Sequence, residues 1–109
     1  MLRLGRMIGL HPQFEDHYRH AHANPWPEVN AMLKACHFQN YTIFLRKPEN
    51  LMFAYSEYTG SDLAADRAAM QAHAPTQEWL NAMRPCQKPL ASAAPGEWWS
   101  PMEPIFRLD

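Results

Sequence analysis

Three histidines lie close together near the start of the chain, at His17, His20 and His22. Imidazole nitrogens bind metal ions and, because their pKa lies near neutrality, they also act as general acids and bases. On a helix that turns about 100° per residue, His20 lies about 60° to one side of His17 and His22 about 140° to the other. The side chains diverge, so the spacing predicts no three-histidine metal site and no bound metal.

His22 has a neighbour in Tyr18, which lies one helical turn earlier and about 40° away on the same face. A histidine beside a tyrosine on an apolar face is suited to general acid/base chemistry with a hydrogen-bonding partner. The alternative is that His22 only ends a helix, where the negative end of the helix dipole stabilises a cation. The residues alone leave both interpretations open.

Aromatic side chains suited to binding a sugar are numerous for a chain of this length. Aromatic faces pack on the C–H faces of sugar rings, while polar groups around them bind the hydroxyls. Such side chains recur at Trp26, Trp79, Trp98, Trp99, Tyr18 and Tyr41. The alternative is structural: the first two tryptophans anchor the core and the last two fill a dimer interface.

Composition excludes several classes of protein. The 109 residues suffice for one domain with one core, so residues 1–109 are expected to form a single domain. The net charge of −1 offers no basic surface for nucleic acid or an anionic membrane. The polar stretch 11–16 interrupts the apolar N-terminus, so no signal peptide or membrane span is predicted. Cys36 and Cys86 form no C-x-x-C motif and are expected as reduced thiols of a cytoplasmic protein.

Periodicity and turn residues predict alternating strands and helices. The chain divides into strands at 3–10, 38–46, 51–59 and 102–108, and helices at 12–22, 25–36, 62–73 and 75–83. Residues 47–50 are predicted as a hairpin turn, Asn24 as a helix cap, and the proline-rich stretch 85–97 as an irregular loop. The order matches the β-α-β-β-α-β ferredoxin-like plan of the α+β class. Because helices would cover one face of this sheet, we expect a homodimer packed sheet to sheet, a dimeric α+β barrel.

Several separate segments resemble one known family, in the same order along the chain. They are HANPWPE at 22–28 preceded by Tyr18, NYTIFL at 40–45, ENLMFAY at 49–55, TQEW at 76–79 and MEPIFRLD at 102–109. Through them the sequence resembles the L-rhamnose mutarotase family over nearly its whole length. The resemblance implies a small homodimeric α+β protein with a ferredoxin-like core. It also implies that the protein interconverts the α and β anomers of a 6-deoxyhexose, a monosaccharide, without a cofactor.

The resemblance also implies roles for particular residues. His22 falls on the catalytic proton donor of the family, and Tyr18 and Tyr41 fall on tyrosines that contact the sugar. The tandem tryptophan pair of the family falls on Trp79 and Leu80, so the second tryptophan is missing here.

The missing tryptophan bears on which sugar is bound. Related sequences that share the GEWW stretch at 96–99 before the terminal segment look like a subgroup for which L-fucose is a candidate besides L-rhamnose. Trp98 or Trp99 is the candidate replacement for the stacking surface lost at Leu80.

Anomer exchange requires a proton on the ring oxygen, removal of the anomeric hydroxyl proton, opening to the aldehyde and closure on the other face. A single group with a pKa near 7 serves both directions, which suits histidine. We expect His22 to give its proton to the ring oxygen and recover it on closure, while Tyr18 holds that edge of the sugar. Tyr41 would bind a hydroxyl and Trp79 would stack on the ring. The acceptor of the anomeric proton is left open among a water, a tyrosine and a carboxylate such as Glu103.

Two other functions compete with this one. The same aromatic pocket would also serve a sugar-binding module without catalytic activity. Dimeric ferredoxin-like barrels also include cofactor-free monooxygenases and haem-binding proteins, an alternative that rests on fold analogy. Sugar binding without anomer exchange would identify the first, and haem uptake the second.

Overall fold

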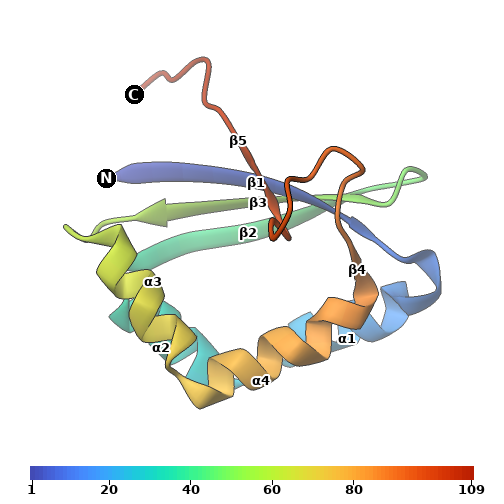
Figure 1. Ribbon diagram of the computed structural model, residues 1–109, viewed down its shortest axis with the longest axis horizontal. Helices are drawn as coiled ribbons and strands as arrows, with labels where there is room; N and C mark the ends of the chain where they lie inside the picture. Colours follow the sequence, from blue (N-terminus) through green and yellow to red (C-terminus); the bar gives the residue numbers. More distant parts are fainter.

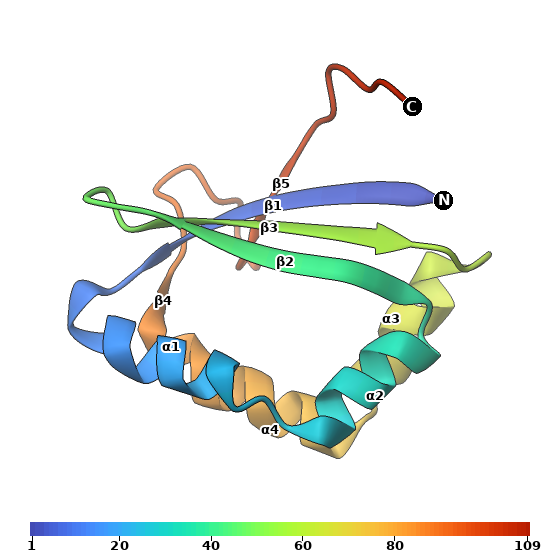
Figure 2. The same cartoon turned by 180° about the vertical axis from the view of Figure 1, so that it is seen from behind.

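A curved antiparallel sheet lies over a layer of helices in the computed structural model, which describes residues 1–109 (Figures 1 and 2). The strands are β1 (Leu2–Leu10), β2 (Phe38–Arg46), β3 (Leu51–Tyr58), β4 (Gln87–Lys88) and β5 (Ser100–Met102). The α-helices are α1 (Glu15–Ala23), α2 (Pro27–Ala35), α3 (Leu63–Gln71) and α4 (Ala74–Met83). Two short 3-10 helices, Pro12–Phe14 and Arg84–Cys86, precede α1 and β4.

The sheet has the strand order β2-β3-β1-β4, with β5 also paired to β1. The long strand β1 runs antiparallel to β3, with Ile8 opposite Met52. On its other edge β1 pairs first with β5, at Gly5 to Met7, and then with β4, at Gly9 and Leu10. All four helices lie on one side of the sheet (Figure 2). This arrangement confirms the ferredoxin-like α+β class that the sequence predicted.

Alternation along the strands decides which side chains face the helices. In β3, Met52, Ala54, Ser56 and Tyr58 are buried, whereas the residues between them are partly exposed. Successive side chains of a strand point to opposite faces, so one apolar set faces the helix layer. The same period applies in β1, whose inward positions include Arg6.

The core is divided into two clusters under the sheet. The larger one lies among β1, β3, α1 and the end of α4, and consists of Ile8, Leu10, Tyr18, Met52, Met83 and Cys86. The smaller one joins the start of β2 to the end of β3, and consists of Cys36, Phe38 and Tyr58. Both cysteines are buried and free, so neither forms a disulfide. Side chains of both clusters line the cavity described below.

Helix α2 begins later than the sequence predicted. Asn24 does not cap it; its side-chain amide donates to the carbonyl oxygen of His20 at 3.0 Å and closes the end of α1. Trp26 takes the capping position, and Pro27 is the first helical residue, where its missing N–H is tolerated. The prediction placed the boundary one proline too early, because Pro25 and Pro27 carry the same helix-starting signal.

The C-terminal strands also differ from the prediction. The stretch predicted as an irregular loop contains β4, and the last strand covers Ser100–Met102 rather than 102–108. Met102 pairs with Gly5, so continuing in the same register would place Pro104 opposite Arg3. Proline has no N–H for a strand ladder, and the chain leaves the sheet there. Residues 103–109 extend away from the helices (Figure 1).

None of the helices combines the length and hydrophobicity that crossing a membrane requires.

Candidate functional site

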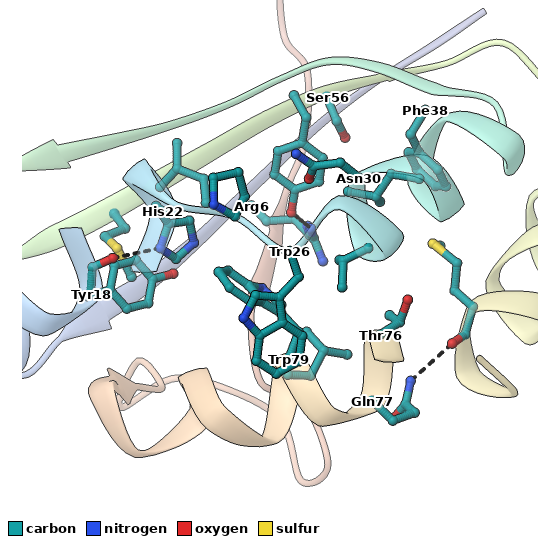
Figure 3. A pocket seen from close by; sticks show the side chains of 18 of the residues that line it. Arg6, Tyr18, His22, Trp26, Asn30, Phe38, Ser56, Thr76, Gln77 and Trp79 are labelled. Carbon is teal, nitrogen blue, oxygen red and sulfur yellow. Dashed lines mark hydrogen bonds between the residues drawn. The ribbon is translucent and has the colours of Figure 1, made fainter. Parts of the chain in front are cut away.

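A cavity of about 990 Å³ lies between the sheet and the helices. Its lining includes the proposed proton donor His22 and the four positions expected at the sugar, Tyr18, Tyr41, Trp79 and Leu80. They come from α1, β2 and α4, three elements that the tertiary fold brings together around one space (Figure 3). The structure thus places these residues together.

The ring of His22 is oriented by the backbone of its own helix. Nδ1 lies 2.8 Å from the carbonyl oxygen of Tyr18, one turn earlier. A carbonyl oxygen only accepts, so Nδ1 carries a hydrogen and donates it. The other ring nitrogen, Nε2, faces the cavity (Figure 3). In the neutral ring Nε2 has the free lone pair, and in the protonated ring it offers a proton to a bound molecule.

Four aromatic rings follow one another along the cavity wall. The rings of Tyr18 and His22 stack, with centroids 4.2 Å apart and an angle of 29°. Trp79 meets His22 edge to face at 5.2 Å, and Trp26 meets Trp79 in the same way at 5.3 Å. This row supplies an apolar surface beside a single titratable nitrogen, which suits a ligand with both a C–H face and polar oxygens.

Burial changes the pKa of both residues that begin this row. Desolvation lowers the pKa of His22 below its ordinary 6.5, and the hydrogen bond to the Tyr18 carbonyl opposes that shift. Desolvation raises the pKa of Tyr18 to about 12. At neutral pH, therefore, the phenol keeps its proton, and the imidazolium of His22 is a stronger acid than that of a solvent-exposed histidine.

The Tyr18 hydroxyl belongs to a short chain of hydrogen bonds that leads away from the cavity. Its oxygen lies 3.1 Å from Nε2 of Gln87, a buried residue in β4. Oε1 of the same amide accepts from the indole N–H of Trp98 at 2.7 Å. Sequence reasoning did not identify Gln87, and no local pattern marks it.

Tyr41 has a different partner. The guanidinium of Arg6 donates to the Tyr41 phenol oxygen at 2.6 Å, and both side chains line the cavity. Arg6 also lies against the ring of Trp99, 5.5 Å from its centroid. Arg6 was not among the residues predicted from the sequence. Its signal was present: a charged residue in phase with Leu4 and other inward apolar residues of β1 marks a buried polar position.

Trp98 and Trp99 do not supply the stacking surface that is missing at Leu80. Neither Trp98 nor Trp99 lines the cavity. Trp98 is engaged with Gln87, and Trp99 packs against the larger core cluster. The second indole at the cavity is that of Trp26, which the sequence left as either a sugar-binding or a core residue. Leu80 is 38% exposed, so the cavity wall is more open there.

The rest of the lining is mostly apolar, and its polar side chains include no carboxylate. Asn30, Ser56, Thr76 and Gln77 lie beyond the aromatic row (Figure 3). The ionisable side chains in the lining other than His22 and the two tyrosines are arginines: Arg6, Arg19 and Arg67. Glu103, the carboxylate that the sequence offered as a candidate acceptor, does not line it. Nor do three or more His, Cys, Asp or Glu side chains gather anywhere in a way that could hold a metal ion.

Comparisons with known proteins show the family to which the chain belongs. The family model for L-rhamnose mutarotase matches residues 3–108. An L-rhamnose mutarotase of Lactiplantibacillus plantarum is 33% identical over 106 residues, which cover 97% of this chain and 81% of that protein. One from Pectobacterium carotovorum is 31% identical over the full length of both chains. A crystal structure of an L-rhamnose mutarotase from Formosa agariphila shares the fold, with a TM-score of 0.78, 21% identity and full coverage of both chains. The chain belongs to the L-rhamnose mutarotase family.

Proposed function

We propose that this protein interconverts the α and β anomers of a 6-deoxyhexose, with L-rhamnose as the first candidate and L-fucose as the second. The family consists of isomerases that act on carbohydrates. One observation in the site carries the proposal: Nε2 of His22 faces the cavity from within a row of aromatic rings, while Nδ1 is held by the Tyr18 carbonyl. This geometry supports His22 as a proton donor beside a surface suited to a sugar ring.

In the proposed reaction, Nε2–H of His22 gives its proton to the ring oxygen of the sugar as the bond between C1 and that oxygen breaks. The anomeric hydroxyl loses its proton at the same time, and C1 becomes an aldehyde. Rotation about the C1–C2 bond presents the other face. On closure the ring oxygen returns its proton to His22, and the aldehyde oxygen takes a proton back from the acceptor to become the anomeric hydroxyl again. The lowered pKa of His22 makes its imidazolium a stronger donor.

Water is the proposed acceptor of the anomeric proton. The cavity lining contains no carboxylate, and Glu103 lies in the exposed segment beyond β5. The oxygens of Tyr18 and Tyr41 already accept hydrogen bonds from Gln87 and Arg6. These occupied oxygens make the tyrosines poor bases and good donors toward the sugar.

The rest of the sugar is proposed to be held more firmly than C1. Trp79 stacks on an apolar face of the ring, Tyr18 holds the edge near the ring oxygen, and Tyr41 binds a hydroxyl. Leu80 borders the ring at the exposed rim. Fixing the far hydroxyls while C1 stays free to rotate allows closure on either face.

We also propose a homodimer that packs through the face of the sheet opposite the helices. Ile43 and Leu45 line the cavity, so Phe44 between them points to that other face, where it is 59% exposed. Phe44→Glu should convert a dimer into a monomer on size-exclusion chromatography with light scattering, because a charge would be buried in the interface. Gln13→Glu, at an exposed position of the helix layer, is the control. A monomeric wild-type protein contradicts this part of the proposal.

The experiment that tests the function is NMR saturation transfer between the anomeric protons of L-rhamnose, L-fucose and D-glucose, with and without the protein. Saturating one anomer should reduce the signal of the other faster in its presence, for L-rhamnose above all. Acceleration for L-fucose and not for L-rhamnose would identify L-fucose as the substrate. Binding of a 6-deoxyhexose without accelerated exchange would identify a sugar-binding module instead.

A further inference from the structure

Gln87 is a buried polar residue with two hydrogen bonds that point in opposite directions. It is 7% exposed and lies in the two-residue strand β4, at the edge of the sheet. One side of its amide meets the Tyr18 hydroxyl at 3.1 Å, and the other meets the Trp98 indole at 2.7 Å. The cavity lining includes Tyr18 but neither of the other two residues, so the chain connects the site to the segment that leads into β5.

The direction of this chain follows from the chemistry of its ends. An indole N–H donates and cannot accept, so the atom of Gln87 that faces Trp98 is the carbonyl oxygen. The amide nitrogen therefore faces Tyr18 and donates to the phenol oxygen. A flipped amide would set two donors against each other at Trp98, which is unfavourable because the hydrogen bond is partly buried and Gln87 is only 7% exposed.

The consequence for Tyr18 is a fixed polarity. A phenol O–H bond lies in the plane of its ring and has two directions there, and the N–H of Gln87 occupies one of them. The phenol proton takes the other direction, and no protein acceptor receives it in the structure. Tyr18 stacks on His22 at 4.2 Å, so this free donor lies beside the imidazole that faces the cavity.

We propose that Gln87 is a positioning residue, itself oriented by Trp98, that makes Tyr18 a hydrogen-bond donor to the sugar oxygen next to His22. The inference rests on the proposed function, because it assigns the donor to the same sugar. It also gives Trp98 a place in the site other than stacking. A sugar oxygen bound in this way has its position fixed relative to Nε2 of His22 before proton transfer.

Two substitutions at Gln87 separate polarity from packing. Gln87→Met keeps the length of the side chain and removes both hydrogen bonds, so the rate of anomer exchange should fall roughly 3- to 10-fold. Gln87→Glu keeps the acceptor for Trp98 and turns the other oxygen into an acceptor for Tyr18, whose proton is then directed away from the sugar. At pH 7.5 we expect the order wild type, then Gln87→Met, then Gln87→Glu in falling kcat/KM. Gln13→Met, at an exposed position outside the cavity, is the matched control.

A double-mutant cycle with Tyr18→Phe distinguishes a positioning residue from a structural one. If Gln87 acts through the Tyr18 hydroxyl, Gln87→Met should lower the rate in the wild-type background and leave it nearly unchanged once that hydroxyl is gone. Circular dichroism and thermal unfolding of each variant show whether it is folded. If Gln87→Met lowers the rate by the same factor in both backgrounds, or if Gln87→Glu is as active as the wild type, the proposal is overturned.

A second measurement does not depend on activity. The indole N–H of Trp98 should exchange slowly with solvent in the wild-type NMR spectrum and faster in Gln87→Met, because its acceptor is lost. If the wild-type protein does not accelerate anomer exchange for any of the sugars tested, the proposed function fails. Unchanged exchange of the Trp98 indole proton in Gln87→Met would overturn the hydrogen-bond chain itself.

Discussion

Nδ1 of His22 lies 2.8 Å from the backbone carbonyl oxygen of Tyr18, within a single helix. A helix places residues four apart on the same face, so this contact is local and needs no partner from elsewhere in the fold. It leaves Nε2 as the only nitrogen of His22 for chemistry, in one known tautomer when the ring is neutral.

Replacing His22 by alanine should lower the rate of anomer exchange by about 100-fold or more, the usual loss for a general acid. The rate is measured by NMR saturation transfer between the anomeric protons, at a sugar concentration well above KM. His17→Ala is the matched control, because His17 lies on the same helix, is exposed and does not line the cavity. An unchanged rate in His22→Ala would remove the donor role and leave the fold as it is.

Exchange should slow as the pH rises. The proposed donor is the imidazolium, and burial lowers the pKa of His22 below 6.5, so the donor form is lost as the pH passes upward through that lowered value. Above it, kcat/KM should fall about tenfold for each pH unit once the uncatalysed rate is subtracted. A rate that rises with pH to a plateau would instead identify neutral His22 as the reacting form.

Arg6→Met should weaken sugar binding more than it slows chemistry. The substitution removes the donor that holds the Tyr41 oxygen at 2.6 Å and frees the phenol to rotate. Because Tyr41 is proposed to bind a hydroxyl away from C1, we expect KM to rise roughly 3- to 10-fold with kcat nearly unchanged. Arg84→Met, at an exposed position outside the cavity, is the control. A fall in kcat at constant KM would place Arg6 at the reacting end of the sugar.

Leu80→Trp restores the tandem tryptophan pair of the family, whose second member is replaced by Leu80 in this chain. Leu80 is 38% exposed at the cavity, so an indole has room there without displacing buried side chains. The added aromatic face should lower KM for L-rhamnose severalfold, and the ratio of KM values for L-rhamnose and L-fucose should change. Equal KM values in the variant and the wild type would show that this position does not contact the sugar.

The elements of the fold were largely predictable because their signals are local. Runs of aromatic and β-branched residues predicted β2 and β3, with the hairpin between them. Asp62 starts α3 as predicted, and its side chain caps the helix by accepting from the N–H of Ala65 at 3.0 Å. The last strand was predicted wrongly, because a strand ends where its partner edge or its own hydrogen-bond donors end. Pro104 ends β5, but only the register with β1 shows that its missing N–H falls at a pairing position.

The sequence by itself determined the pair at the centre of the site. Tyr18 and His22 share a helix, and the helical period alone predicted that they would meet, as their stacked rings do. Only the tertiary structure decided their surroundings. Gln87 reaches Tyr18 across 69 positions, and Arg6 reaches Tyr41 across 35. Such contacts depend on which strands lie beside β1 and on where they pair, and no period or local motif in the chain encodes that arrangement.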